Sequence, residues 1–358
     1  MTHLKRLLWF NMVTDADAAI QGFTTAWLNA AAPFCDAIDV LTMFKGRLAL
    51  ADNITVYSVG KDKGYSEPRR ALEFYRTLNK LLRHNHYDAC FIHMIQLFAV
   101  MGAPLIKPRG IPMTLWYAHK STPLTLKLAE KWVDQVVTAS PESFRLPTSK
   151  VRIIGHGIDT DHFIPGPPRA AAAFNLLSVS RIAPIKRLEI MISAVKTLHE
   201  QGFTSLRLRL VGSVYPQDEA YAAGLRRLIH DAGLDHAISL PGPIRHADVL
   251  AEYHQADAVL NMSATGSVDK AVLEGMACAL PVITANEAFH TMLAPWADTL
   301  LVPPDSPEQL AARLKTLLTM PAPQRAALGA ALRAVVIESH SLAHLMPLLI
   351  SSLNPNLE

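Results

Sequence analysis

Short apolar runs alternate along the chain with longer segments whose apolar residues recur every three to four positions. Such runs are typical of buried parallel strands, and such periodic segments are typical of amphipathic helices. Over 68–84, for example, Leu72, Tyr75, Leu78 and Leu82 fall on one helical face. Before residue 165 we expect strands over 7–12, 37–41, 54–59, 88–93, 113–117, 135–139 and 151–154, and helices over 19–31, 68–84, 96–101 and 123–133.

A Pro-rich segment interrupts this alternation. Pro165 is followed by Gly166, Pro167 and Pro168, and proline neither continues a helix nor lies inside a sheet. We therefore expect a domain boundary at 165/166. Beyond it the pattern predicts strands over 175–180, 207–211, 238–240, 258–261 and 281–284, and helices over 187–201, 219–232, 247–255, 270–278, 307–318, 323–339 and 342–353.

The two arrays predict an α/β protein with two Rossmann-like, doubly wound domains, over 1–165 and 166–338. In such sheets ligands bind at the carboxyl ends of the strands, so we expect a site in a cleft where the two domains face each other. A length of 358 residues agrees with about two domains. A hydrophobic content of 50% with only 18% charged residues excludes a disordered chain.

Membrane insertion and secretion are both disfavoured. No window reaches the roughly 18–20 consecutive apolar residues of a spanning helix. Lys5 and Arg6 before a short apolar run resemble a weak signal peptide, but a first buried strand explains that run better. Cys35, Cys90 and Cys278 are too few and too far apart for a disulfide framework or a zinc site, which predicts a cytoplasmic protein.

The net charge of +3 is unevenly distributed. Residues 1–165 hold 19 Lys and Arg against 14 Asp and Glu, whereas residues 166–358 hold 15 against 17. A basic half favours an acidic acceptor or a peripheral contact with the inner face of a membrane. Ordinary scatter of surface charge is an equally good explanation.

Two stretches in the second half carry candidate chemistry. Arg181 and Lys186 lie in the turn between an expected strand and helix, where cations and free amides of the helix start can hold a phosphate. Taken alone, they could also be solvated loop cations.

The second stretch joins the expected strand 258–261 to the next helix. Ser267 or Asp269 can cap this helix, and Lys270 and Glu274 lie four apart on one face. A carboxylate at Glu274 could accept both hydroxyls of a ribose. An exposed structural ion pair is the alternative.

These stretches resemble the donor site of family 4 glycosyltransferases, which have the GT-B fold. The resemblance implies that Arg181 and Lys186 hold the donor diphosphate and that Glu274, the second Glu of the family's paired-Glu motif, binds the ribose. The segment 155–165 is similar to the family's interdomain segment. Gly212 ends a strand like the family's "VG-x-G", and Ile244 lies in a segment similar to the one that meets the nucleotide base.

One departure concerns the first Glu of that motif, because Gly266 stands in its place. Ser267, Val268, Asp269 and Lys270 stand where the family usually has Gly-Phe-Gly-Leu, and we expect this loop to approach the donor. Asp269 could replace the missing carboxylate, and Lys270 could add a cation to the diphosphate.

Two histidines follow expected strands in the first half. His119 resembles the family's histidine that contacts the donor sugar near the reacting carbon, which gives it a catalytic role, and Lys120 beside it could steer phosphate. For His93 the residues favour neither a functional nor a structural role.

The resemblance implies a retaining glycosyltransferase that transfers a sugar from a UDP-, GDP- or ADP-sugar to a hydroxyl of a glycan, lipid or small molecule. The first domain would bind the acceptor, the second the donor, and residues 339–358 would cross back to the first domain. Fixed cations and a helix start can stabilise the leaving diphosphate, so no metal or other cofactor is required and none is expected, nor is nucleic acid. A nucleotide-sugar-binding protein without transfer and a GT-B epimerase are the alternatives. A dinucleotide-dependent oxidoreductase is disfavoured because no G-x-G-x-x-G follows a strand.

Overall fold

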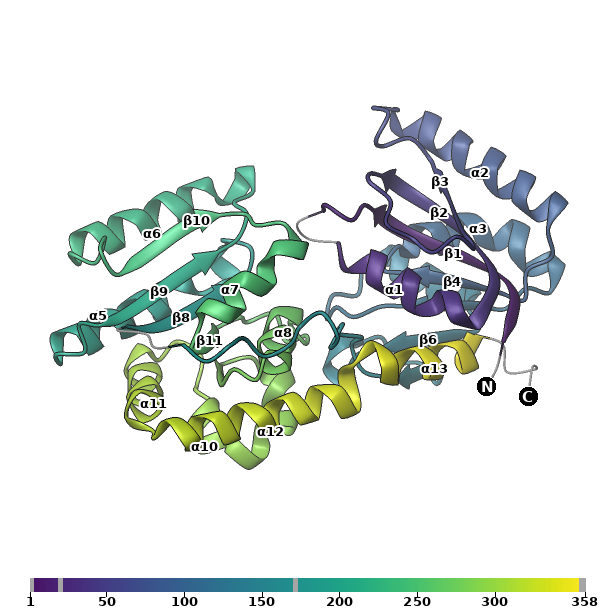
Figure 1. Ribbon diagram of the computed structural model, residues 1–358. Helices are drawn as coiled ribbons and strands as arrows, with labels where there is room; N and C mark the ends of the chain where they lie inside the picture. Colours follow the sequence, from purple (N-terminus) through teal and green to yellow (C-terminus); the bar gives the residue numbers. More distant parts are fainter. Residues whose placement is uncertain (1–2, 19–21, 170–172, 354–358) are drawn as a thin grey trace. The chain divides into compact units, whose positions relative to one another are not determined.

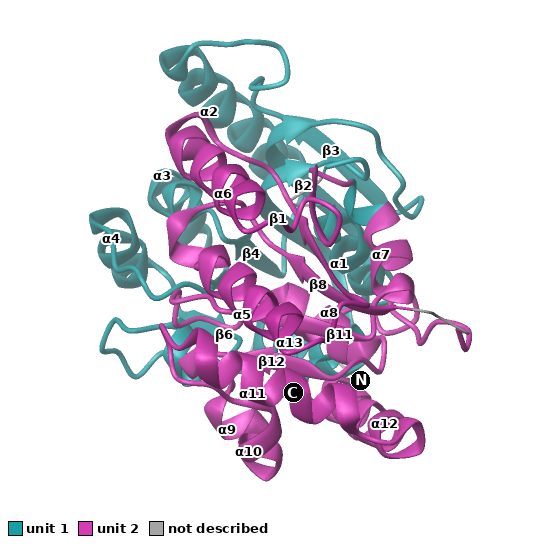
Figure 2. Cartoon of the chain, turned by 90° about the vertical axis from the view of Figure 1, so that its left-hand side faces the viewer, with its two compact units in different colours: residues 1–157, 245–247, 339–358 teal, residues 158–244, 248–338 magenta. Residues whose placement is uncertain are grey.

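The computed structural model describes residues 3–18, 22–169 and 173–353. The chain forms two compact units, coloured separately in Figure 2. Unit 1 comprises residues 1–157, 245–247 and 339–358, and unit 2 comprises 158–244 and 248–338. The chain thus first leaves unit 1 inside the segment 155–165, earlier than the 165/166 boundary expected from the prolines.

Unit 1 contains a seven-stranded parallel sheet in the order β3-β2-β1-β4-β5-β6-β7 (Figure 1). The run 7–12 forms a strand paired on both sides, as expected for its buried apolar residues. The strands are β1 (Leu4–Thr14), β2 (Cys35–Lys45), β3 (Ile54–Ser58), β4 (Ala89–His93), β5 (Met113–Trp116), β6 (Gln135–Thr138) and β7 (Val151–Ile153).

Helices cover both faces of this sheet. One face packs against α1 (Phe23–Ala31) and α13 (Leu342–Leu353), and the other against α2 (Glu67–His84), α3 (Gln96–Ile106) and α4 (Leu124–Trp132). The helix α13 contacts α1, β4, β5 and β6, so the C-terminal helix returns to unit 1 as expected. The start of the helix expected over 19–31 lies outside the described residues.

Unit 2 contains a five-stranded parallel sheet in the order β10-β9-β8-β11-β12. Its strands are β8 (Phe174–Val179), β9 (Leu206–Val211), β10 (Ile238–Gly242), β11 (Ala258–Asn261) and β12 (Val282–Thr284). Its longer helices are α5 (Leu188–Glu200), α6 (Glu219–Asp231), α7 (Val249–Gln255), α8 (Lys270–Ala277), α11 (Pro307–Thr319) and α12 (Ala322–His340). The fold class expected from the sequence is confirmed: both units are α/β with doubly wound parallel sheets.

Two details differ from the expected elements. The helix expected over 96–101 continues to Ile106 with Pro104 inside it. Gly102 and Ala103 of this extension are buried, and a Cβ atom on Gly102 would lie 3.1 Å from the Phe10 ring of β1. Short helices α9 (His290–Leu293) and α10 (Ala297–Leu300) lie in a segment for which no helix is expected. Within the described residues, no helix is both long and apolar enough to span a bilayer.

Two of the segments where the chain passes between the units, near residues 155 and 339, touch inside unit 1. A Cβ atom on Gly155 would lie only 2.2 Å from the carbonyl oxygen of Ser339, and Gly155 has a φ of +82°. A glycine is therefore required at this crossing. The neighbouring His340 is buried, and burial followed by the charge of His344 lowers the pKa of its imidazole to about 4.

We predict that His340 makes the free energy of unfolding pH-dependent. A folded-state pKa below the ordinary value of 6.5 gives stability that is complete above pH 6.5 and is lost as the pH falls towards 4. The loss approaches about 3 kcal/mol. In denaturant unfolding, the free energy of unfolding of His340→Gln should change less between pH 7 and 4 than that of wild type. The exposed control His290→Gln should match wild type. If the free energy of unfolding changed equally with pH in all three proteins, the prediction would be wrong.

Candidate functional site

The sheet of unit 2 reverses its direction of winding between β8 and β11. The chain continues from β8 to its neighbour β9 on one side, and β11 pairs with β8 on the other. In open α/β sheets this switch point leaves a crevice at the carboxyl ends of the two strands. The loops 180–187 and 262–269 follow these ends, so the two stretches singled out in the sequence meet at the switch point. The backbone N–H of Ala264 donates to the carbonyl of Ile185 at 3.0 Å and joins them.

A carboxylate bound by three nitrogen donors lies at the centre of this crevice. Oδ1 of Asp269 accepts from Nζ of Lys186 at 2.8 Å. Its Oδ2 accepts from Nδ2 of Asn261 at 3.0 Å and from Nδ2 of Asn286 at 3.3 Å. Nζ of Lys186 also donates to Oγ of Ser263 at 3.2 Å. These contacts fix the Lys186 ammonium beside the start of α8.

The first turn of α8 is not capped by the residue that precedes it. Asp269 occupies the N-cap position, but its side chain is held by Lys186, Asn261 and Asn286 and makes no hydrogen bond to the helix amides. An aspartate at this position ordinarily accepts from the second or third amide of the helix. Here the positive end of the helix dipole and a lysine face the same crevice, which is the chemistry of an anion site.

A second cation and a glycine complete this end of the sheet. Nε of Arg181 lies 3.7 Å from Oδ2 of Asp218, and its guanidinium lies 5.0 Å from the ring centroid of Tyr215. A Cβ atom on Gly212 would lie 1.7 Å from the backbone oxygen of Ser180, so only glycine lets the chain after β9 pass this closely. The N–H of Gly212 donates to the carbonyl of Gly242 at 3.0 Å and joins the ends of β9 and β10.

The expected ribose-binding carboxylate is buried. Glu274 on α8 is 5% exposed, and its Oε2 lies 3.0 Å from the hydroxyl of Tyr253 on α7. Burial and the charge of Glu274 raise the pKa of Tyr253 well above its usual range. The phenol therefore stays protonated and donates a hydrogen bond to Glu274. Nζ of Lys270 is also buried. Burial lowers the pKa of this ammonium, and the negative charge of Glu274 acts in the opposite direction.

The remaining residues expected at the donor site fall into two groups. Gly266 has a left-handed φ of +61°, and Ser267 and Val268 after it are buried, with the Ser267 carbonyl accepting from Nδ2 of Asn286 at 2.9 Å. Ile244 follows β10 and is half-buried against the core of unit 2. The structure thus brings Lys186, Asp269 and the 266–268 loop into one network. It places Ile244 in a loop of its own.

In unit 1, His119 follows β5 and is exposed. Its Nδ1 accepts the backbone N–H of Ser121 at 3.1 Å and lies 2.8 Å from the Ser121 hydroxyl. These contacts orient the imidazole.

His93, at the end of β4, has a different setting. It is 4% exposed and stacks on Trp27, with ring centroids 4.5 Å apart. Trp9, Phe23 and Phe91 have ring centroids within 6.0 Å of its own. Packing explains the position of His93.

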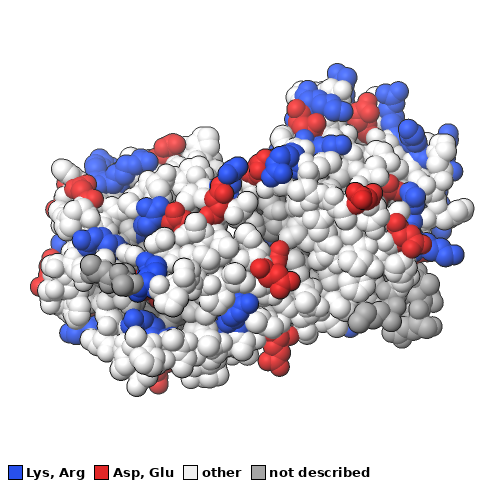
Figure 3. Space-filling view, in the orientation of Figure 1, with Lys and Arg blue, Asp and Glu red and all other residues white. Residues whose placement is uncertain are grey.

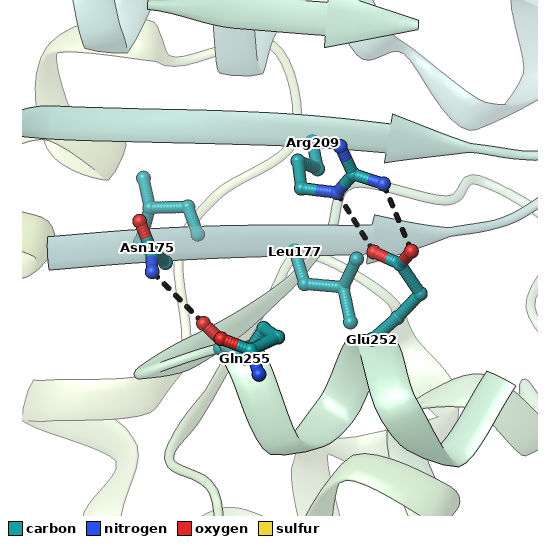
Figure 4. A pocket seen from close by; sticks show the side chains of 7 residues that line it. Asn175, Leu177, Arg209, Glu252 and Gln255 are labelled. Carbon is teal, nitrogen blue, oxygen red and sulfur yellow. Dashed lines mark hydrogen bonds and ion pairs between the residues drawn. The ribbon is translucent and has the colours of Figure 1, made fainter. Parts of the chain in front are cut away.

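A cavity of about 300 Å³ on unit 2 lies away from the crevice (Figure 4). It lies between α7 and the strands β8 and β9, and Asn175 at the start of β8 lines it. A two-pronged ion pair between Arg209 and Glu252, at 2.7 and 2.8 Å, crosses it, and Nδ2 of Asn175 donates to the Gln255 carbonyl. Its polar groups therefore already bind one another, and we do not assign the site here.

Sequence reasoning missed the two asparagines that hold Asp269. Asn261 ends β11, and Asn286 follows β12, so each is a polar residue at the carboxyl end of an apolar strand. A polar residue at this position could have indicated both asparagines as site residues. Tyr253 was also missed, because an aromatic residue at a buried helical position is typical of the hydrophobic core.

Known proteins similar to this chain are glycosyltransferases. Residues 173–320 match the family model "Glycosyl transferases group 1". Over 203 residues the chain is 33% identical to a D-inositol 3-phosphate glycosyltransferase of Kineococcus radiotolerans, covering 51% of this chain and 46% of the relative. Over 199 residues it is 28% identical to the putative colanic acid biosynthesis glycosyltransferase WcaL of Escherichia coli, covering 53% and 46%. The chain therefore matches about half the length of these relatives.

Solved structures share the fold over almost the whole chain. Sucrose-phosphate synthase from Thermosynechococcus elongatus gives a TM-score of 0.77 at 18% identity, covering 96% of this chain and 97% of its own. HepE from Anabaena, in complex with UDP and glucose, gives a TM-score of 0.75 at 17% identity, covering 98% of this chain and 100% of its own. The GT-B fold is thus confirmed, and the match of residues 173–320 to the group 1 model supports the resemblance to family 4 glycosyltransferases.

We predict that Tyr253→Phe destabilises unit 2. The substitution keeps the ring but removes the hydroxyl, which lies 3.0 Å from both the Glu274 carboxylate and the Ala271 carbonyl, and the loss of a hydrogen bond to a charged group costs about 1.5–3 kcal/mol. Denaturant unfolding should show this loss, and Tyr75→Phe, a change on an exposed helix face of unit 1, should show none. A Tyr253→Phe protein as stable as wild type would argue against the hydrogen bond to Glu274.

Proposed function

We propose that this chain is a glycosyltransferase that takes its sugar from a nucleoside-diphosphate sugar. The observation that carries the proposal is the crevice at the switch point of unit 2, where the Lys186 ammonium and the uncapped start of α8 lie together. The group 1 domain over 173–320 supports it. The UDP and glucose bound to HepE support a donor of this class.

The donor diphosphate binds at the crevice in this proposal. Lys186 and the first amides of α8 contact its oxygens, and Arg181 adds a second cation from the loop after β8. Cations and a helix start stabilise the negative charge that develops on the leaving diphosphate. Lys270, on the same helix start, contributes its charge to the local potential when protonated. Glu274 binds the ribose hydroxyls, with Tyr253 holding its other oxygen.

Asp269 acts through Lys186 in this proposal. Both of its oxygens already accept hydrogen bonds, from Lys186 on one side and from Asn261 and Asn286 on the other. It therefore holds the lysine where the diphosphate binds. Gly266, in place of a carboxylate, gives room for the donor sugar next to this network, with Ser267 and Val268 forming the wall of the loop and Gly212 and Ile244 bordering the nucleotide.

The transfer step retains the configuration of the sugar by attack from the side of the leaving group. The acceptor hydroxyl oxygen forms the new bond to the anomeric carbon, and the bond from that carbon to the diphosphate breaks. The hydroxyl proton passes to the departing diphosphate oxygen. His119 in unit 1 hydrogen-bonds the transferred sugar, and unit 1 binds the acceptor, a glycan, lipid or small-molecule hydroxyl.

We predict that Lys186→Ala weakens the binding of the nucleoside diphosphate that the wild type binds best. A lost charge-assisted hydrogen bond costs about 1.5–3 kcal/mol, which is roughly 10- to 100-fold in Kd. Calorimetry with UDP, GDP and ADP measures it. Lys196→Ala, on the exposed side of α5, removes the same charge elsewhere on unit 2 and should leave Kd unchanged. Equal affinities for Lys186→Ala and wild type would reject the site, and no binding by wild type would reject the proposed function.

We predict that His119→Ala slows transfer without weakening diphosphate binding. Removal of one hydrogen bond that stabilises a transition state costs about 100-fold or more in rate. The readout is release of nucleoside diphosphate from its sugar, with calorimetric Kd measured on the same protein. Ser121→Ala keeps the backbone N–H that orients His119, so it should retain most of the rate. An unchanged rate for His119→Ala would remove this residue from the mechanism.

A further inference from the structure

Three helices of unit 1 form a layer on one face of its sheet. The helices α2, α3 and α4 bury Phe74, Phe98 and Leu126 against that face, and α3 packs against both of its neighbours. Their opposite sides therefore face outward. Figure 2 shows these helices in teal, away from α1 and α13, which cover the other face. We call this outward side the helical-layer face.

The helical-layer face carries an apolar stripe on α4. Leu124, Leu128 and Trp132 follow one another at intervals of four residues, so they lie along one side of the helix. Their exposed fractions are 70%, 39% and 44%. Large apolar side chains that recur with helical spacing on an exposed face mark an interaction surface, whereas scattered ones do not.

Basic residues border this stripe. Lys127 and Lys131, both exposed, lie one helical turn apart beside it. Neither α4 nor its stripe carries an exposed acidic side chain, since Glu130 is half-buried and accepts from Thr148. An apolar stripe with lysines along its edge matches the chemistry of a helix that lies in the interface of an anionic bilayer.

The helix α2, on the other side of α3, carries residues of the same kinds. It exposes Leu72 and Tyr75 together with Arg76, Lys80 and Arg83. Figure 3 shows blue side chains over this helix with fewer red ones among them, and Glu67 and Glu73 of α2 pair with Arg70 and Arg76. The surplus of basic residues in the first half of the chain is thus concentrated on the face that also exposes apolar side chains.

We propose that the helical-layer face docks unit 1 on an anionic lipid bilayer. Leu124, Leu128 and Trp132 enter the headgroup boundary, and the lysines and arginines around them contact acidic headgroups. A second copy of the chain fits this face poorly, because pairing two such faces would bring like charges together. The proposal does not depend on the proposed sugar transfer.

Vesicle flotation of the full chain tests the proposal. We expect binding to phosphatidylcholine vesicles that contain phosphatidylglycerol, little binding to phosphatidylcholine alone, and a loss of binding at high salt. Leu124→Ser combined with Trp132→Ser should reduce partitioning about tenfold by removing apolar contact. Lys127→Glu with Lys131→Glu should reduce it by a similar factor through charge.

Matched changes on unit 2 serve as controls. Arg226→Glu with Arg227→Glu, and separately Leu228→Ser, alter exposed residues of the same types on α6 and should bind vesicles as wild type does. Circular dichroism melting of every variant confirms that it is folded. Wild type that stays with the unbound fraction at low salt would overturn the proposal. So would stripe variants that bind like the controls, or a solution dimer that Trp132→Ser abolishes in a chain that binds no vesicles.

Discussion

The carboxylate of Asp269 ties together the loops that follow three neighbouring strands. Lys186 comes from the loop after β8, Asn261 from the end of β11, and Asn286 from the loop after β12. A partly buried carboxylate needs charge and hydrogen bonds to compensate for its lost solvation, and these donors supply both. Because these three residues bind the Asp269 carboxylate, its side chain does not cap the start of α8. The position of the lysine and the exposure of the helix dipole are therefore two results of one interaction.

Charge burial continues along α8. Glu274 lies one turn beyond Lys270, and both charged groups are removed from water. Tyr253 keeps its proton because burial and Glu274 disfavour the phenolate, so it acts as a donor to the carboxylate. A helix with buried lysine and glutamate is costly as pure structure, since an apolar pair would pack there without a desolvation penalty. Such a cost is typical of positions selected for what they bind.

Much of the fold could be predicted from the sequence, because the buried parallel strands of both units are short apolar runs with clear ends. The continuation of α3 through Pro104 could not, since a proline ordinarily ends a helix. Arg181, Lys186 and Glu274 could be singled out from spacing and resemblance. The partners of Asp269 could not, because Asn261 and Asn286 approach it only once β11 and β12 pair. The interaction depends on the tertiary structure and not on any local sequence pattern.

The basic residues of the chain lie in different settings in the two units. In unit 2 two of the cations that pair with carboxylates, Lys186 and Arg181, follow the carboxyl end of β8 and lie beside Asp269 and Asp218. In unit 1 the basic residues of α2 and α4 lie on the outside of a helical layer. Local ion pairs of α2, such as Arg70 with Glu67 at 3.5 Å, are exposed and weak, so its surplus charge acts on the solvent side. Net charge alone would not separate these cases. In unit 2 Lys186 and Arg181 thus lie beside carboxylates at the ends of the strands, whereas in unit 1 the basic residues of α2 and α4 form part of a surface.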